Sequence, residues 1–224
     1  MYKMIKIIIP ARGGSKRIPG KNLVDLNGKP LISYSIENSL RVTKEVYVST
    51  DCPKIQDVSI RYGAKIIRRP ASICTDFCKT DSAIKHFLNT VSDVNFFACV
   101  QVTTPLMESK YLKKGFDKIQ SYEFDSVLSV CKSEKFYWTT DGEPVNFSIR
   151  DRLRTQDMEK HYEENGAFYI TTKEQFLSNN SLMGGKVGFI ETPHIISLEI
   201  DDLQDLNIVK AIQKVSMVRT RNKG

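Results

Sequence analysis

Residues 7–23 read IIIPARGGSKRIPGKNL, and the rest of the chain is arranged around them. The stretch begins inside a run, residues 5–9, that is apolar except for Lys6 and whose β-branched composition predicts a buried strand. Pro10 ends this run, because proline lacks the N–H group that a central strand donates to its ladder. The loop that follows therefore leaves the end of a buried strand.

The loop at residues 11–23 combines an adaptable backbone with positive charge. Its glycines are Gly13, Gly14 and Gly20, and its cations are Arg12, Lys16, Arg17 and Lys21. Ser15 and Asn22 add side chains that form hydrogen bonds. Glycines allow backbone N–H groups to approach an anion, and cations complete the site, so the pattern predicts polyphosphate binding. The Walker A and dinucleotide-binding patterns do not fit. A basic surface loop is the alternative.

The segment PARGGSKRIPGKN, residues 10–22, resembles the N-terminal signature of the acylneuraminate cytidylyltransferases, also called CMP-sialic acid synthetases. Relatives in that family activate legionaminic, pseudaminic or ketodeoxynonulosonic acid. The resemblance implies transfer of CMP from CTP to a nine-carbon 2-keto sugar acid, with release of pyrophosphate and with Mg²⁺ as cofactor. Cytidylyltransferases for the eight-carbon sugar Kdo are the nearer alternative, but they usually carry proline at the position of Asn22.

Length and composition are those of a soluble globular protein. The 224 residues fit a single domain, residues 1–224, and no apolar run reaches the length of a membrane span. The N-terminus lacks a secretory signal, so we expect a cytoplasmic location without membrane contact. The five scattered cysteines predict free thiols, although Cys74 and Cys78 could pair as metal ligands. The net charge of +7 allows a more distant alternative, a nucleic-acid-binding module, which we do not expect because aromatic residues are not interleaved with the cations.

Strand and helix patterns alternate after the loop. The predicted strands cover residues 45–49, 64–67, 95–102 and 125–130, and the predicted helices begin near residues 31, 53 and 83 and cover residues 108–121. This alternation predicts an α/β sheet with parallel pairing and ligands at the carboxyl ends of its strands. The family resemblance implies more: a Rossmann-like nucleotidyltransferase fold of the GT-A-like type, with a mixed, mostly parallel sheet, helices on both faces and a protruding dimerisation arm.

The resemblance assigns CTP-binding residues in two places. The loop supplies Ala11, Arg12, Gly13, Ser15, Lys16, Lys21 and Asn22, of which Arg12, Lys16 and Lys21 are the expected catalytic residues. Farther along the chain, Arg69 matches the arginine of the family's Arg-Pro segment, and Thr80 matches a following Thr or Ser only in part. An arginine in solvent is the alternative for Arg69.

Two later motifs resemble the family's sugar-binding segments. Residues 101–106 read QVTTPL, in which Gln101 and Thr103 are expected to bind the sugar. A role of Thr103 or Thr104 in capping the next helix is the alternative. Residues 165–170 read NGAFYI, in which Tyr169 matches a tyrosine on the substrate side. A buried core tyrosine is the alternative there.

Near the C-terminus, residues 199–206 read EIDDLQDL and resemble the family's metal-binding segment. Two-residue spacing places Glu199 and Asp201 on one face of an expected strand end, where they would bind Mg²⁺. The family has aspartate at both positions, so Glu199 is a departure. Solvated edge carboxylates are the alternative. Asp202 is expected to cap the following helix.

Between residues 131 and 164 the regular patterns stop, and the stretch is polar and aromatic. Long irregular segments are uncommon inside compact domains. The family resemblance interprets residues of about 131–162 as an arm that packs on a second subunit, which implies a homodimer. The sequence names neither the sugar acid nor a general base, because the three histidines, His86, His161 and His194, match no family motif.

Overall fold

The apolar run forms strand β1 (Ile5–Pro10), which includes Pro10 as its last residue. The structure is a computed structural model that describes residues 5–74 and 79–221, so Cys78 lies outside the described residues. Side chains of β1 alternate between the two faces of the sheet: Ile7 and Ile9 join one core cluster, and Ile8 joins another. A strand buried on both faces explains why Ile7, Ile8 and Ile9 are all apolar. Lys6, the charged residue of the run, is buried as well, and its Nζ donates to Ser92 O.

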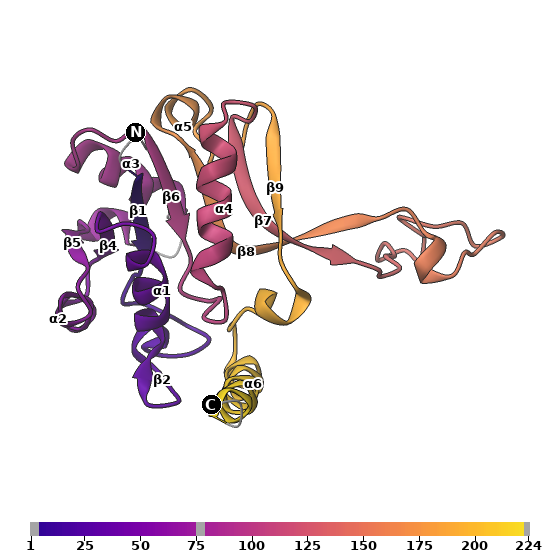
Figure 1. Cartoon of the computed structure of the whole chain (residues 1–224), viewed down its shortest axis with the longest axis horizontal. Helices are drawn as coiled ribbons and strands as arrows, with labels where there is room; N and C mark the ends of the chain where they lie inside the picture. The colour runs from indigo at the N-terminus through magenta and orange to yellow at the C-terminus, as the bar shows by residue number, and fades with distance from the viewer. Residues whose placement is uncertain (1–4, 75–78, 222–224) are drawn as a thin grey trace.

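One sheet of seven strands organises the molecule, in the order β5-β4-β1-β6-β8-β7-β9 (Figure 1). The other six strands are β4 (Val46–Thr50), β5 (Lys65–Arg68), β6 (Phe96–Val100), β7 (Ser126–Ser133), β8 (His161–Thr172) and β9 (Val187–Glu191). Strand β8 pairs antiparallel with both of its neighbours, and all other pairs are parallel. The predicted mixed, mostly parallel sheet is therefore confirmed.

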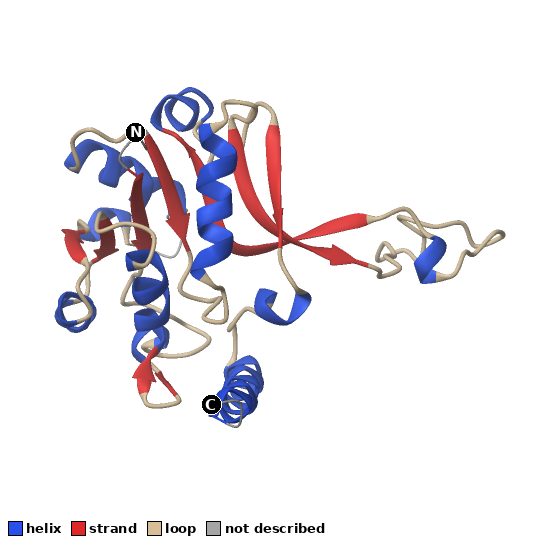
Figure 2. Ribbon diagram, viewed as in Figure 1, coloured by secondary structure: helices blue, strands red, loops and turns tan. Residues whose placement is uncertain are grey.

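Helices cover both faces of this sheet (Figure 2). They are α1 (Leu31–Leu40), α2 (Pro53–Arg61), α3 (Thr80–Thr90), α4 (Ser109–Gln120), α5 (Lys173–Asn179) and α6 (Leu203–Arg221). Helices α1, α2 and α4 pack with Ile7 and Ile9, whereas α3 and α5 pack with Ile8 on the opposite face. Among the described residues, no helix is both long and apolar enough to cross a bilayer.

Two expectations about local structure are wrong. Residues 199–201 are not a strand end: the segment runs from a 3-10 turn (His194–Ser197) to α6 without strand pairing. A backbone hydrogen bond from Ile200 N to Thr103 O, 2.8 Å long, fixes it instead. Neither threonine caps the next helix, because Glu108 is the N-cap of α4 and gives no side-chain cap. Asp202 does cap α6, since its Oδ1 accepts from the N–H groups of Gln204 and Asp205.

Strands β7 and β8 continue beyond the body of the sheet and carry residues 134–160 away from it (Figure 1). The expected break at Cys131 comes slightly too early, since β7 and β8 still pair at Ser133 and His161. At the far end, Phe147 contacts the rings of Phe136 and Trp138, with centroids 4.8 and 4.9 Å away. The predicted protruding arm therefore exists as a structural feature.

Candidate active site

The site lies where the topology of the sheet reverses. From β1 the chain continues to β4 and β5 on one side, while β6 pairs with the other side of β1. Such a reversal opens a crevice at the carboxyl ends of the two central strands, because their following loops leave in opposite directions. The loop after Pro10 and the segment after Val100 meet at this crevice.

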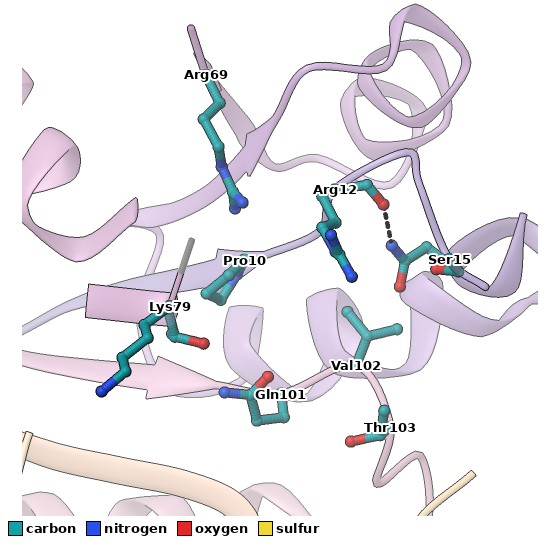
Figure 3. A pocket seen from close by; sticks show the side chains of 10 residues that line it. Pro10, Arg12, Ser15, Arg69, Lys79, Gln101, Val102 and Thr103 are labelled. Atoms are coloured by element: carbon teal, nitrogen blue, oxygen red, sulfur yellow. Dashed lines mark hydrogen bonds between the residues drawn. The ribbon is translucent and has the colours of Figure 1, made fainter. Parts of the chain in front are cut away.

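A cavity of about 180 Å³ occupies the crevice (Figure 3). Its lining includes seven residues predicted to bind CTP or the sugar: Arg12, Ser15, Asn22, Arg69, Thr80, Gln101 and Thr103. The side chains of Arg12 and Arg69 approach from one side, and Gln101 and Thr103 lie on the other. Residues from three loops, far apart in the sequence, therefore meet at one place as the motifs predicted.

A second cavity, of about 430 Å³, adjoins the first and shares Arg12 and Ser15 with it. Its other lining residues are Lys16, Arg17 and Lys21, so four of its five residues are cations. Fixed cations around a hollow without an equal number of anions favour a polyanion. The first cavity is thus of mixed polarity, the second is positively charged, and the two adjoin each other.

Internal hydrogen bonds hold the glycine-rich loop in this shape. Ala11 is buried in the core, and its N–H donates to Ser49 O over 2.9 Å. Asn22 is buried as well, and its Nδ2 donates to Arg12 O over 2.9 Å, which joins the two ends of the loop (Figure 3). Ala11 and Asn22 therefore fix the backbone, and Asn22 also lines the cavity.

Arg69 is half-buried, which contradicts the alternative of an arginine in solvent. Its Nη2 donates to Ser49 O over 2.8 Å, and its Nε donates to Ser49 Oγ over 3.2 Å. Burial lowers the pKa of Arg69, yet a guanidinium stays charged at neutral pH. A positive group that has already lost part of its hydration binds an anion or a polar base edge at a smaller desolvation cost.

Lys21 links the loop to the predicted metal-binding segment. Its Nζ donates to Ile200 O over 2.9 Å and lies 3.3 Å from Asp201 Oδ1. The same carboxylate oxygen accepts from Arg17 Nη2 over 2.8 Å. Asp201 therefore lies beside the positively charged cavity, within reach of the groups expected to hold phosphates.

Glu199 is packed against a glycine that leaves it room. Gly166 has a φ of +63°, and a Cβ at this position would come within 2.5 Å of Glu199 Oε1. Although solvent reaches Glu199, partial desolvation raises the pKa of its carboxyl group, and the charge of Asp201 raises it further. A carboxylate whose charge is disfavoured by a neighbouring carboxylate is suited to a cation that both can share.

Tyr169 and Glu199 are not part of the lining of the two cavities. Tyr169 is half-buried on β8 opposite Cys99 of β6, and its hydroxyl donates to Glu164 Oε1. Burial and this hydrogen bond raise the pKa of Tyr169. Asn165, on the same strand, is buried, and its Nδ2 donates to Thr192 Oγ1 and Ser197 Oγ. It supports the strand that carries Tyr169 rather than facing the cavities.

Three charged residues near the site were given no individual role from the sequence. Lys79 lines the first cavity directly before Thr80, Arg17 lines the second, and Asp51 accepts a hydrogen bond from Gly13 N over 2.9 Å. Arg17 was visible as a loop cation, but its partner Asp201 lies 184 residues away. Charge alone gives no signal that distinguishes Lys79 from the many exposed lysines of the chain.

The carboxylates fit a hard divalent cation in part. Glu199 and Asp201 supply oxygen donors, which Mg²⁺ prefers. In the described part of the chain no group of three or more His, Cys, Asp or Glu side chains gathers as a metal site. A cation held here would therefore complete its shell with water or substrate oxygens, as Mg²⁺ commonly does.

Comparison with solved structures defines the class of fold. The chain superposes on a CMP:2-keto-3-deoxy-manno-octonic acid synthetase complexed with CTP, with a TM-score of 0.73, 19% identity and coverage of 95% of this chain and 99% of that one. It also superposes on 4-diphosphocytidyl-2C-methyl-D-erythritol synthase from Anaerococcus prevotii, with a TM-score of 0.69 and 13% identity, over 95% of this chain and 99% of that one. The fold is thus a Rossmann-like nucleotidyltransferase fold, as predicted.

The chain belongs to the cytidylyltransferase family, whose model matches residues 6–221. It is 32% identical to the pseudaminic acid cytidylyltransferase of Campylobacter jejuni, over 93% of this chain and 96% of the relative. It is 34% identical to N-acylneuraminate cytidylyltransferase A of Danio rerio, over 88% of this chain and 48% of that protein. The chain thus spans about half of that longer relative. The predicted class of enzyme, a nucleotidyltransferase of the N-acylneuraminate cytidylyltransferase type, is confirmed, and enzymes of this family generally use a divalent metal.

Proposed function

We propose that this protein transfers CMP from CTP to a nine-carbon 2-keto sugar acid and releases pyrophosphate. The observation that carries the proposal is the pair of adjoining cavities, one of mixed polarity and one lined by four cations. A nucleoside triphosphate has the same division into a polar base and ribose and a polyanionic tail. Relatives that are 32% and 34% identical over most of this chain carry the names of pseudaminic and N-acylneuraminate cytidylyltransferases, which supports a nine-carbon acid.

Each predicted residue then has a role in binding or positioning. Arg12, Lys16 and Lys21 hold the triphosphate, while Ser15, Gly13 and Asn22 shape the loop around it. Arg69 and Thr80 contact the nucleoside side, and Gln101 and Thr103 face the sugar across the cavity. Tyr169 is placed farther away, and we assign it to the outer wall of the sugar site.

The reaction joins the anomeric hydroxyl of the sugar to the α-phosphorus and breaks the bond to the β-phosphate oxygen. Fixed cations that contact the developing negative charge lower the barrier, because they need no reorganisation during the reaction. Glu199 and Asp201 would hold Mg²⁺, which supplies further charge stabilisation at the phosphates when bound. The ion pairs of Asp201 with Arg17 and Lys21 support this assignment, because both cations line the second cavity.

We further propose that the protein is a homodimer in which the arm at about residues 131–162 contacts the second subunit. The arm exposes large apolar side chains. Trp138, Val145, Ile149 and Leu153 have exposed fractions of 48%, 62%, 61% and 49%. Apolar side chains gathered on a projecting segment indicate a protein interface.

The experiment that tests the function measures pyrophosphate release with CTP and a panel of sugar acids. Pseudaminic, sialic, legionaminic and ketodeoxynonulosonic acids form one arm, and Kdo forms the other. The proposal expects turnover with at least one nine-carbon acid that exceeds turnover with Kdo. Turnover with Kdo alone would establish the eight-carbon alternative, and no turnover with any acid would contradict the proposed reaction.

A further inference from the structure

An acidic side chain lies beside the phosphate-binding loop, where a polyanion makes it unfavourable. Asp51 directly follows β4, and its Oδ1 accepts from Gly13 N at 2.9 Å. Like charges near a triphosphate repel it, so a carboxylate here costs binding energy unless it has another effect. Asp51 lines neither cavity itself, but its charge acts on Arg69, which lines the first cavity.

Asp51 does not cap the helix that follows it, although capping is the usual role of an aspartate before a helix. Helix α2 follows Asp51, but its N-cap is Cys52, and no side chain caps it. The turn is held by a different contact, since Cys52 N donates to Thr50 Oγ1 over 3.1 Å. The carboxylate of Asp51 is therefore directed to the loop after β1 and not to its own helix.

The backbone around Asp51 forms a rigid base for the loop. Residues Pro10 and Ser49 are paired in the parallel ladder, and Arg69 N donates to Thr50 O over 2.8 Å. Above this base, Gly13 approaches so closely that a Cβ on it would lie 2.9 Å from Cys52 Cβ. The Gly13 N–H bond to Asp51 is thus a side-chain link between the glycine-rich loop and the end of β4.

We propose that Asp51 is a positioning residue that anchors Gly13 and thereby orients the phosphate-binding loop. This inference rests on the proposed function for its consequence, the binding of CTP. Its structural part, the anchor itself, holds for the free protein. The hydrogen bond from Gly13 N needs an acceptor oxygen at residue 51 but no negative charge. Substitutions that remove the charge alone, or the charge and the acceptor together, therefore test the anchor.

Two substitutions separate the acceptor from the charge. Asp51→Asn keeps Oδ1 and removes a negative charge beside the triphosphate, so the Kd for CTP measured by calorimetry should stay unchanged or decrease. Asp51→Ala removes the acceptor too, so the Kd should rise about tenfold, the effect of one lost hydrogen bond of about 1.4 kcal/mol. Asp57→Ala, on the exposed face of α2, is the matched control and should leave the Kd unchanged. Equal changes in the Kd for CTP in Asp51→Asn and Asp51→Ala would overturn the proposal.

A second measurement reports the anchor without any nucleotide. Cys52 is half-buried beneath Gly13, so its alkylation rate, followed by peptide mass spectrometry, reports how firmly the loop covers it. We expect Asp51→Ala to raise this rate about tenfold, and Asp51→Asn and Asp57→Ala to leave it near wild type. An unchanged rate in Asp51→Ala would overturn the anchor. Faster alkylation in a protein whose wild type binds no CTP would instead support the anchor and contradict the proposed function.

Discussion

Lys21 connects the two halves of the candidate site. Its ammonium contacts both the backbone and the carboxylate of the segment at residues 200–201, and its side chain is 14% exposed. A largely buried cation forms stronger electrostatic interactions than a surface lysine, because less water screens it. The residue is therefore placed to contact a phosphate on one side and to hold Asp201 on the other.

We expect Lys21→Ala to lower kcat/KM for CTP by roughly 30- to 1,000-fold, because a lost charge-assisted contact in the transition state costs about 2–4 kcal/mol. Steady-state kinetics with pyrophosphate detection measures this loss, and thermal unfolding should show a much smaller change. Lys29→Ala is the matched control, since Lys29 pairs with Glu37 at the surface over 2.7 Å. Normal turnover of Lys21→Ala at saturating CTP would show that the loop does not bind phosphate.

The two acidic residues of the proposed metal site should differ in importance. Asp201 contacts two cations of the second cavity, whereas Glu199, two residues earlier, lines neither cavity. We expect Asp201→Asn to abolish activity, Glu199→Gln to reduce it less, and Glu199→Asp to be tolerated. Titration of activity with Mg²⁺ after EDTA treatment measures the effect. Wild-type turnover that survives EDTA, or ordinary Mg²⁺ dependence in Asp201→Asn, would contradict the assignment.

At the residue scale, motifs identified the site better than they identified its internal contacts. The loop signature, the Arg-Pro segment with the Thr80 that follows it, and the QVTTPL segment named seven side chains that line one cavity. Lys79 and Asp51 could not be found in this way. The hydrogen bond of Asp51 spans 38 residues, and only the pairing of β1 with β4 brings its two ends together. A sequence pattern records residue types, not partners across the sheet.

At the scale of elements, the central strands were predictable because burial on both faces requires a continuous apolar run. Strand β9 and helix α5 were not predicted, nor was the short hairpin of β2 (Asp25–Leu26) and β3 (Lys29–Pro30). Strand β9 alternates between buried and exposed residues and is fixed by its pairing with β7. Its position depends on a neighbour that is distant in the sequence, so local composition indicates it only weakly.

Strand β8 contains an irregularity that affects the site. The ladder of β7 and β8 shifts register between Leu128 and Val130, and Gly166 takes its positive φ in the partner strand. Asn165 stabilises this point, since its Oδ1 accepts from Ser129 Oγ over 2.6 Å. A bulge of this kind redirects the strand and leaves space above its backbone. Glu199 occupies that space.

We expect Gly166→Ala to reduce activity by displacing the Glu199 carboxylate, and to destabilise the fold by about 1–2 kcal/mol because alanine disfavours a positive φ. Gly142→Ala is the matched control. Gly142 has a φ of +84° but open space around it, so it should show a similar backbone cost without loss of activity. Chemical denaturation and the Mg²⁺ dependence of turnover separate the two effects. Equal activity of both variants would show that the Glu199 position is unimportant for the reaction.

At the scale of the whole molecule, the charges are not distributed evenly. The net charge is +7, and four cations gather around one cavity at the carboxyl ends of the strands. A concave cluster suits a small polyanion and steers it into the site, whereas binding to a duplex favours a broad basic face. The cavities proposed to bind the nucleotide therefore lie in the domain body, and the arm leaves the body through β7 and β8.

The internal contacts of the arm would stabilise it only weakly if it were an isolated hairpin. Arg152 stacks on Phe136 with its Cζ 4.2 Å from the ring centroid, and Phe136 in turn contacts Phe147, so this part of the arm packs as a small cluster. An isolated two-stranded ribbon is only marginally stable in water. Several apolar side chains of the arm also remain exposed to solvent. Burial of these side chains against a second subunit would stabilise the arm at about 25 cal/mol per Å² of apolar surface.

We therefore predict a dimer through this arm. Sedimentation velocity at micromolar concentration should show a species of twice the chain mass of 25.5 kDa. Residues 134–160 can be replaced by a short glycine-containing turn, because Ser133 and His161 are already paired across the ladder and a turn can join them. This variant should be a monomer, because it lacks the proposed interface. Charge reversal of Lys29 at the domain surface should leave the dimer intact. A wild-type protein that sediments only as a monomer, or a shortened variant that remains dimeric, would contradict the role of the arm.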